Sequence, residues 1–514
     1  MKKFIQLLVV ATVATTGNIY AQGIYAGDAL RFSRTDYGSS ARFKGLGNAQ
    51  TSLGGDISSI GGNPAGLGMF TRSEFSITPE FNNIQANTNF LGQNTKTNKN
   101  PLNLNQAGAV WYNPIVRPKG SDLNKGILSV VWGIGYNRNN DFSINNSYSS
   151  NNAQQSITQD WAQQANGITP GNLDRGSISN LAFQSFLIDK APGTTNQYLP
   201  SGIPNSQGVS NIRTGSTSEF NFSGAMNISN QLYLGASIGF VNVRYESDVL
   251  YTESGTVANN GGTVGAPNLE DQPNPHRGQS YDLAYRSNRS SDGSGIVGRL
   301  GLIYKPVDAI RVGATFQTPT WMHVETQKSE FLDTQFSGGD ATNPALVQSD
   351  IINSNFNYNL RTPYKGSFGA SAILGGNAII TADIDYVDYG TTKLSVSDGY
   401  ANSILSENQY IKNNYGSAVN YRVGAEYRID KFSIRGGYGV NGTPYKHDTQ
   451  NTFQVKSYSG GIGYRVSQYY IDLAYVRQQT NYSDAPFELD DASEPIATTK
   501  LSKNNVFMTV GIRF

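Results

Sequence analysis

The chain ends in the stretch Val506-Phe507-Met508-Thr509-Val510-Gly511-Ile512-Arg513-Phe514, in which two kinds of side chain alternate. The even-numbered positions are all apolar, whereas the odd-numbered ones include Thr509, Gly511 and Arg513. A period of two is the side-chain period of a β-strand. An apolar face together with an aromatic carboxyl terminus is typical of the last strand of an outer-membrane β-barrel, whose apolar face contacts lipid.

Alternation of the same kind recurs through the chain from about residue 72, and we count fourteen such segments. In the clearest of them Tyr421, Val423 and Tyr427 oppose Arg422 and Glu426. A soluble β-sandwich would bury the apolar face, whereas a membrane barrel would turn it to lipid and enclose the charges in a wet lumen. Alternation alone does not separate these two folds.

The connections between the segments do separate them, because short and long connections alternate along the chain. Short turns are expected at 229–231, 306–308, 375–377, 429–431 and 466–468. Long polar loops are expected near 146–216, 253–293, 327–354, 397–408 and 483–501. In an up-and-down barrel this places all short turns on one rim and all long loops on the other. We therefore predict an all-β, antiparallel transmembrane barrel of about fourteen strands over residues 72–514, rather than a β-sandwich or jelly roll.

The amino terminus predicts export. Lys2 and Lys3 precede an apolar run from Phe4 to Ala14, and Ala21-Gln22 is a plausible cleavage site, so residues 1–21 are interpreted as a signal peptide. The run is too short for a membrane-spanning helix. These features predict a protein of the Gram-negative outer membrane that contacts outer-membrane lipid.

Composition excludes several classes of function. Without Lys2 and Lys3 the chain has 37 basic and 38 acidic residues, and it has no basic run that would indicate nucleic-acid binding. It contains no cysteine, which excludes disulfides and thiolate chemistry. No cofactor or metal site is predicted. The few histidines, His276, His323 and His447, do not form a catalytic pattern, so we expect no enzyme.

Residues 22–71 do not alternate, and their end resembles the amino-terminal hatch of the FadL/TodX family of outer-membrane transporters. The matching stretch runs from Asp56 to Leu67 and contains Asn63-Pro64-Ala65. Later matches, in the order of that family, are Tyr364–Ala370, Ala382–Tyr389, Tyr421–Tyr427 and Asp472–Tyr475. The resemblance spans essentially the whole chain after the signal peptide. It implies a monomeric barrel plugged by the hatch, which admits hydrophobic molecules such as fatty acids, related lipids, detergents or aromatic hydrocarbons by passive diffusion.

The resemblance also suggests where function would lie. It gives Asn63, Pro64 and Ala65 a structural role in the hatch, although an ordinary Asn-Pro turn would look the same. It implies that the start of the mature chain, Gln22 to Tyr25, reaches the ligand pocket. It further implies a kinked third strand with an opening towards lipid. Gly133 and Gly135 would permit such a bend, or they could simply ease strand packing.

Two further groups of residues carry open alternatives. An apolar island in the longest loop is either an extracellular capture site or a small core that orders the loop; it comprises Leu181, Phe183, Phe186, Leu187 and Ile188. A set of lumenal charges is expected to pin the hatch; it comprises Arg299, Arg311, Asp383, Asp385, Arg422, Glu426 and Arg428. One arginine could instead bind a ligand carboxylate, but the sequence does not say which.

Three functions compete at this point. The first is a channel for long-chain fatty acids or similar hydrophobic compounds. The second is a receptor or adhesin that uses the long loops, including a haem receptor in which His276 or His447 would be a ligand. The third and weakest is an outer-membrane hydrolase. Substrate choice depends on the shape of a pocket, which no motif in the sequence reports.

Overall fold

The computed structural model of the chain describes residues 24–118, 120, 122, 124–258, 274–396 and 401–514. The predicted signal peptide (residues 1–21), with its cleavage site, lies outside these residues. So do parts of the loops expected at 253–293 and 397–408.

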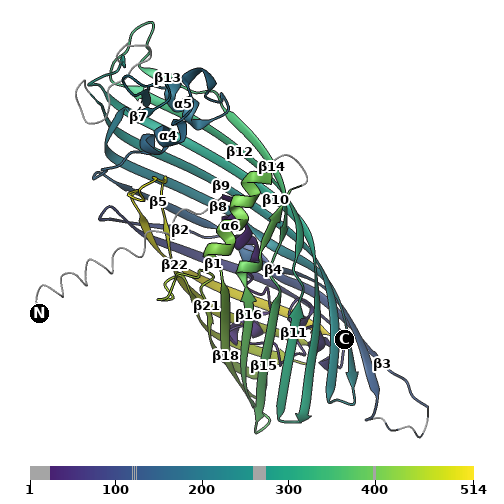
Figure 1. The fold of residues 1–514 in the computed structure, drawn as a ribbon. Helices are drawn as coiled ribbons and strands as arrows, with labels where there is room; N and C mark the ends of the chain where they lie inside the picture. The colour runs from purple at the N-terminus through teal and green to yellow at the C-terminus, as the bar shows by residue number, and fades with distance from the viewer. Residues whose placement is uncertain (1–23, 119, 121, 123, 259–273, 397–400) are drawn as a thin grey trace, which may run out of the picture.

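Most of the chain is strand (Figure 1). The long strands are β1 (Glu74–Phe90), β3 (Leu102–Pro114), β4 (Ile127–Asp141), β8 (Gly202–Ile228), β9 (Leu232–Val257), β10 (Ser280–Val307), β11 (Ile310–Gln317), β12 (Trp321–Phe336), β14 (Ile352–Arg361), β15 (Lys365–Leu374), β16 (Ala378–Asp388), β18 (Ser417–Ile429), β19 (Phe432–Asn441), β20 (Val455–Val466), β21 (Tyr469–Asp484) and β22 (Ala497–Arg513). Shorter strands are β2 (Gln93–Lys99), β5 (Ile144–Ser150), β6 (Ile188–Lys190), β7 (Tyr198–Pro200), β13 (Leu346–Gln348) and β17 (Lys393–Ser395). The helices are α2 (Ile24–Ser33), α3 (Ala41–Gly45), α4 (Ile157–Ala165), α5 (Ile178–Gln184) and α6 (Ala401–Asn414), with short 3-10 turns η1 (Ile57–Ile60), η2 (Pro64–Met69), η3 (Pro170–Asn172) and η4 (Tyr389–Thr391).

The strands close into an antiparallel barrel with fourteen positions around its wall, as the sequence predicted. Closure is made by the carboxyl-terminal stretch itself, because β22 pairs with the first strand, β1, from Glu74↔Arg513 to Phe90↔Ala497. Five wall positions are formed by two segments in succession: β2 and β3, β4 and β5, β16 and β17, β11 and β12, and β14 and β15. The last two break at Pro319 and Pro363, because proline cannot donate a ladder hydrogen bond.

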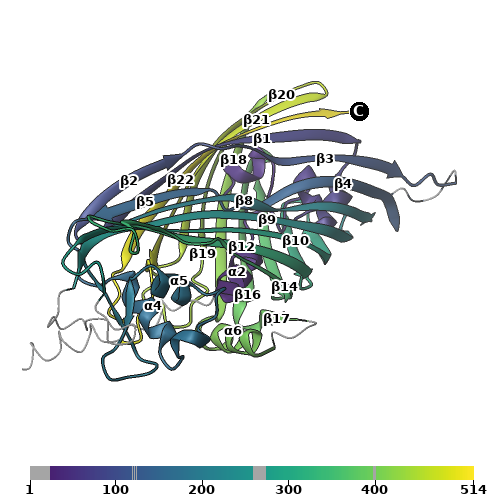
Figure 2. The ribbon, with the colours of Figure 1, turned by 90° about the horizontal axis from the view of Figure 1, so that it is seen from above.

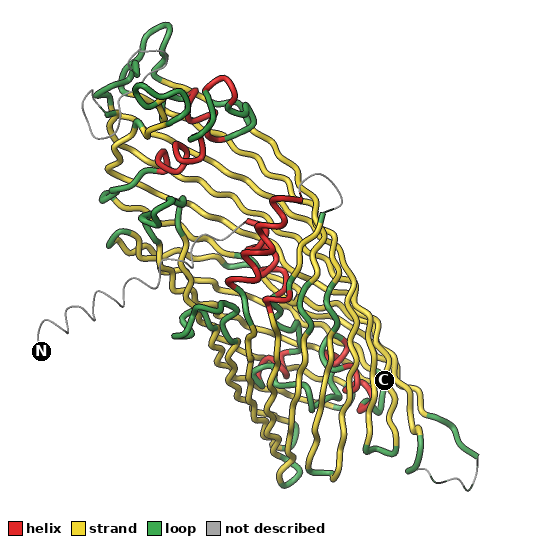
Figure 3. Tube along the Cα trace, viewed as in Figure 1, coloured by secondary structure: helices red, strands yellow, loops and turns green. Residues whose placement is uncertain are grey.

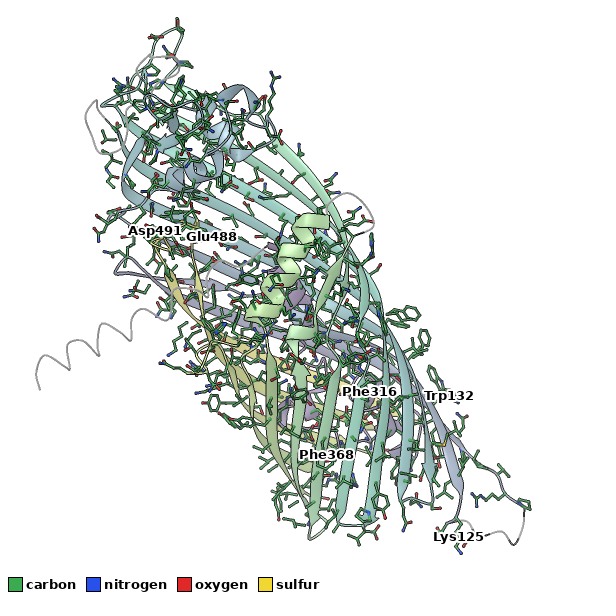
Figure 4. All side chains as sticks on the ribbon, viewed as in Figure 1. Lys125, Trp132, Phe316, Phe368, Glu488 and Asp491 are labelled. Carbon is green, nitrogen blue, oxygen red and sulfur yellow. The ribbon has the colours of Figure 1, made fainter. Side chains whose placement is uncertain are left out.

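The outer face of the lower barrel is apolar. On β22, Val506, Met508 and Val510 are 38–44 % exposed, whereas Phe507 and Thr509 point inward and are buried. Trp132, Phe316 and Phe368, labelled in Figure 4, belong to the same exposed apolar surface. On β10 the surface runs from Ile296 to Tyr304, roughly 25–30 Å along the strand, which matches the apolar band of a membrane barrel. The prediction that the apolar face turns outward is confirmed, as expected for an outer-membrane β-barrel.

Above this apolar surface the wall is much taller on one side than on the other. β8, β9 and β10 have 26–28 residues each, whereas β18, β19 and β20 have 10–13. The loops expected at 146–216 and 253–293 are therefore partly strand, since β8 begins at Gly202 and β10 at Ser280. The apolar alternation stops above the apolar band: Ser290 and Asp292 continue the outward row of β10 above Ile296. The strand with the clearest alternation, β18, begins only at Ser417, because the preceding segment Ala401–Asn414 is helix α6.

The barrel interior is filled by chain at both levels (Figures 2 and 3). Residues 34–71, here called the lower hatch, contain α3, η1 and η2 and occupy the lower half. Helix α2 lies higher, inside the curve of the wall and next to α6. Residues 151–201, here called the lid, carry α4 and α5 and cover the tall side of the upper end. Among the described residues, no helix combines the length and the apolar character needed to cross a membrane.

Candidate functional site

The floor of the lumen is built on the Asn63-Pro64-Ala65 motif. The Asn63 side chain caps η2 by accepting a hydrogen bond from the Ala65 amide at 3.1 Å. Its Nδ2 donates to the Thr51 carbonyl at 2.6 Å within the hatch and to the Leu302 carbonyl of β10 at 3.2 Å. Proline suits the first helical position, where no amide donor is needed. The motif therefore ties the lower hatch both to itself and to the barrel wall.

Glycines on the inner face of the wall allow this close approach. A Cβ built on Gly301 of β10 would clash with Asn63 Oδ1 and lie 2.9 Å from Pro64 Cδ. A Cβ on Gly235 of β9 would clash in the same way with the backbone of Pro64 and Ala65. Sequence reasoning missed these two positions, although a glycine on the inward row of a strand is a signal that another backbone comes close.

Gly133 and Gly135 of β4 also face the lower hatch. A Cβ on either would lie 3.0–3.2 Å from the Ile60 side chain, at the end of η1. β4 has two register shifts against β8: one lies before the glycines, between Ile127 and Ser129, and one after them, between Arg138 and Asn140. The two glycines thus make room for Ile60, and the second irregularity begins three residues beyond Gly135.

The wall has a gap beside this irregularity. β3 pairs with β4 only as far as Gln106↔Asn137, so the ladder stops there. Residues 36–39 of the hatch lie in the gap: the Asp36 amide donates to the Asn139 carbonyl at 2.7 Å, and Asn137 Nδ2 donates to the Gly38 carbonyl at 2.5 Å. The hatch therefore supplies backbone partners where two neighbouring strands separate.

Buried charges fasten the lower hatch to the wall. Arg42 of α3 donates to Glu426 of β18 at 3.0 and 3.2 Å, and Arg435 of β19 donates to the same carboxylate at 2.6 Å. Arg435 also pairs with Asp472 of β21 at 2.6 Å. The Glu426 carboxylate thus joins a hatch arginine and a wall arginine. The Asp472 carboxylate supplies the second negative charge, so that two arginines face two carboxylates. Such an arrangement is costly to break, because removing one partner leaves a buried charge without a counterion.

The other predicted charges divide into three groups. Asp383 accepts the Gln50 and Thr51 amides of the hatch at 2.7 and 2.8 Å. Arg299 pairs with Glu219, which also belongs to the wall. Asp385 pairs with two other wall residues, Arg422 at 2.6 Å and Lys365 at 3.3 Å. Arg311 donates to the Leu53 carbonyl of the hatch at 3.3 Å, whereas Arg428 is exposed near the short turn after β18. Arg42, Glu219, Lys365 and Arg435 were not predicted.

A cavity of about 30 Å³ lies directly above this floor, with further space open to solvent at its mouth. It extends from the end of α2 to the wall beside the two proline breaks. Its apolar lining comprises Phe32, Val241, Met322, Pro363, Val387 and Tyr389, and its polar lining includes Glu219, Arg299 and Lys365.

Above the cavity the interior becomes apolar. Ala26, Ala29, Leu30 and Phe32 of α2 are buried in one cluster with side chains from seven strands and α6, which include Val243, Val297, Val324, Leu360 and Ile404. We call this cluster the upper compartment. The Ala26 amide donates to Glu407 of α6 at 2.7 Å, and Tyr25 lies against Phe356 with ring centroids 4.3 Å apart.

The apolar island of the lid is buried. Leu181, Phe183, Leu187 and Ile188 are at most 7 % exposed, and Phe186 packs against them. Their cluster includes Trp161 of α4 and wall residues such as Tyr281 and Phe336. This is a core that orders the lid, so the expected extracellular capture site is not an open groove in this structure.

His276 belongs to the same core. Its ring stacks on Phe336 with centroids 3.8 Å apart and meets Phe186 edge-on at 5.3 Å. The residue is only 1 % exposed, so its ring does not face the outside, where a receptor would present a haem ligand. His447 is exposed in the segment that follows β19.

The fold matches solved outer-membrane transporters. A crystal structure of the toluene transporter TodX of P. putida superposes with a TM-score of 0.53 and 12 % identity, covering 92 % of this chain and 98 % of that one. A second crystal structure of Pseudomonas putida TodX gives 0.51 and 13 %, covering 94 % and 100 %. No family model and no curated protein sequence matches the chain. The resemblance predicted from the sequence is therefore confirmed for the fold.

Proposed function

We propose that the chain is an outer-membrane channel for the passive uptake of hydrophobic molecules, namely long-chain fatty acids, related lipids or aromatic hydrocarbons. The observation that carries this proposal is the upper compartment: a membrane barrel with a polar, plugged floor encloses apolar side chains from several wall strands above it. A general porin would have no use for such a compartment, because polar solutes gain nothing from apolar contact.

The compartment and the cavity below it form one binding region. Phe32, Val241 and Met322 belong both to the apolar cluster of α2 and to the lining of the cavity. An apolar ligand would exchange its water contacts for these side chains at roughly 25 cal/mol for each Å² of apolar surface buried. The likeness of the fold to a toluene transporter supports the same class of ligand.

The way out that we propose is the gap in the wall between β3 and β4. A ligand leaving there enters the lipid without crossing the floor, provided that residues 36–39 move. Gly133 and Gly135 keep Ile60 and the lower hatch close beside this gap. Asn63, Pro64 and Ala65 hold the floor in place while this occurs.

The test is uptake of labelled oleate and labelled toluene by a host that lacks its own transporter and expresses this chain in its outer membrane. We expect uptake of at least one of them above the empty vector. Absence of any gain for both, with the barrel confirmed by its heat-modifiable migration, would remove the proposal.

A double variant tests the role of the floor in uptake without removing the barrel. Asn63→Ala combined with Pro64→Ala should change uptake while the barrel still forms, because the motif bonds the hatch to Leu302 and makes no strand. Unchanged uptake would reduce the motif to an ordinary turn.

A further inference from the structure

Helix α2 carries a carboxylate into the middle of the upper compartment. Asp28 has a fully buried side chain (0 % exposed) and pairs with Arg289 of β10 at 2.6 Å. It also pairs with Arg31 of its own helix. The Asp28 Oδ2 atom makes no hydrogen bond. An acidic side chain in an apolar compartment is costly unless a cation holds it.

The arginine of this pair, Arg289, belongs to the barrel wall. The Arg289 guanidinium lies over the Tyr245 ring at 5.1 Å, and Tyr358 is buried beside it. Arg31 covers the same Tyr245 ring at 4.2 Å. A wall arginine stacked on a fixed aromatic ring is an oriented receptor for a carboxylate.

Arg289 differs from Arg299 and Lys365, two cations that line the cavity, in where its partner comes from. Arg299 pairs with Glu219 at 2.8 Å, and Lys365 pairs with Asp385 at 3.3 Å, so both have partners in the wall. In the described part of the chain the ion-pair partner of Arg289 is Asp28, which lies on a helix packed inside the barrel. The nearby Glu407 accepts the Ala26 amide. If α2 leaves, Arg289 therefore loses its paired carboxylate whereas the other two keep theirs.

From this geometry we infer that Arg289 is the residue that selects the ligand, and that Asp28 occupies the place of a ligand carboxylate. The inference rests on the proposed function and narrows its substrate class to mono-anionic amphiphiles with an apolar body. When α2 moves aside, the ligand carboxylate pairs with Arg289 and its tail replaces the apolar side of the helix among Val243, Val297 and Val324. A neutral hydrocarbon fills the same space but leaves Arg289 as an unpaired buried cation.

The experiment measures binding of dodecanoate and of dodecan-1-ol, which share one chain length, to the full-length protein in nanodiscs. The wild type should bind both ligands, dodecanoate more tightly. Arg289→Gln should lower the affinity ratio of dodecanoate to dodecan-1-ol by roughly tenfold or more, as expected for a lost charge-assisted pair. Asp28→Asn should tighten both ligands by the same factor, because it weakens the docking of α2 and leaves the receptor unchanged.

The control is Arg244→Gln on β9, an exposed arginine that pairs with Glu246 at 2.8 Å and should change neither ligand. If Arg289→Gln yields no heat-modifiable barrel, Arg289→Lys takes its place, and the ratio should fall by a smaller factor.

The outcomes decide different claims. An unchanged ratio in the Arg289 variant overturns the selectivity role, and unchanged affinities in Asp28→Asn overturn the surrogate role of Asp28. A wild type that binds dodecan-1-ol as tightly as dodecanoate overturns the inference but leaves the channel proposal in place. A wild type that binds neither ligand also overturns the inference, whereas the channel proposal is decided by the uptake of oleate and toluene.

Discussion

The lower and upper halves of the lumen are both filled by the segment that precedes β1, but by different kinds of contact. Below, the lower hatch is held by buried ion pairs and by backbone packing on wall glycines, such as Arg42 to Glu426 and Asn63 against Gly301. Above, within the described ranges, α2 is held by many apolar side chains together with a single ion pair to the wall, Asp28 to Arg289. Directional polar contacts specify one arrangement and are expensive to leave unmade. Apolar contacts accept any partner of suitable shape, so we expect a ligand to replace the upper filling and to leave the lower one in place.

The largest effect should come from breaking the ion-pair set of the floor. Glu426→Ala leaves Arg42 and Arg435 without their shared carboxylate, at a cost of about 3–5 kcal/mol. We expect the lower hatch to loosen and the single-channel conductance in planar bilayers to rise well above that of the wild type.

Arg428→Ala is the matched control for this variant, because it removes an exposed charge from the same strand, two positions away. Equal conductance in the two variants would show that the floor does not depend on the buried network.

A substitution at Gly301, a wall glycine against which Asn63 and Pro64 of the hatch pack, should give the next largest effect. Gly301→Ala places a methyl group against Asn63 and Pro64, which we expect to destabilise the seated hatch by about 1–3 kcal/mol. Limited proteolysis within residues 34–71 should become several times faster.

Gly298→Ala makes the same change on the same strand at a position that does not touch the hatch, and so serves as the control. Its added Cβ lies 3.5 Å from Thr318 Cγ2, an ordinary contact, so proteolysis should stay at the wild-type rate. Faster cleavage in this variant as well would assign the effect to strand propensity.

A substitution in the upper half should behave in the opposite way. Phe32→Ala removes a buried ring that packs near Phe142 and Tyr245 and also lines the cavity. The barrel ladder does not include α2, so the thermal unfolding midpoint of the barrel should change little. The enlarged apolar space should bind toluene several times more tightly, measured by titration calorimetry.

Leu405→Ala truncates an exposed side chain of α6. It should leave both the unfolding midpoint of the barrel and the affinity for toluene unchanged. A fall in the barrel midpoint with Phe32→Ala as large as that with Gly301→Ala would erase the distinction between the two halves.

The two halves of the lumen also differ in how many of their contacts could be predicted from the sequence. The barrel and several floor charges, including Asp383 and Glu426, could be predicted because lipid on one side and a wet lumen on the other impose an alternation that is visible in the sequence. The partners Glu219 and Arg435 were missed, since ion pairing across a barrel depends on strand register. The upper half gave less signal: with water outside, the alternation of β8 to β10 stops, and nothing marks Asp28 or Arg289 as partners 261 positions apart.

The smallest expected effect concerns the lid, whose packing on the upper wall should depend on pH. Burial raises the pKa of Asp160 on α4 to about 6, and the nearby Asp490 carboxylate adds to the rise. Its ordinary value is about 4, so the docked lid favours the protonated form. Docking should therefore be tightest below about pH 4 and should lose this contribution as the pH rises through about 6. Backbone hydrogen exchange within α4, corrected for the intrinsic effect of pH, should be a few times faster at pH 8 than at pH 5. Asp160→Asn should abolish the difference while leaving exchange in β18 untouched. A pH dependence that survives this substitution would assign the effect to another group.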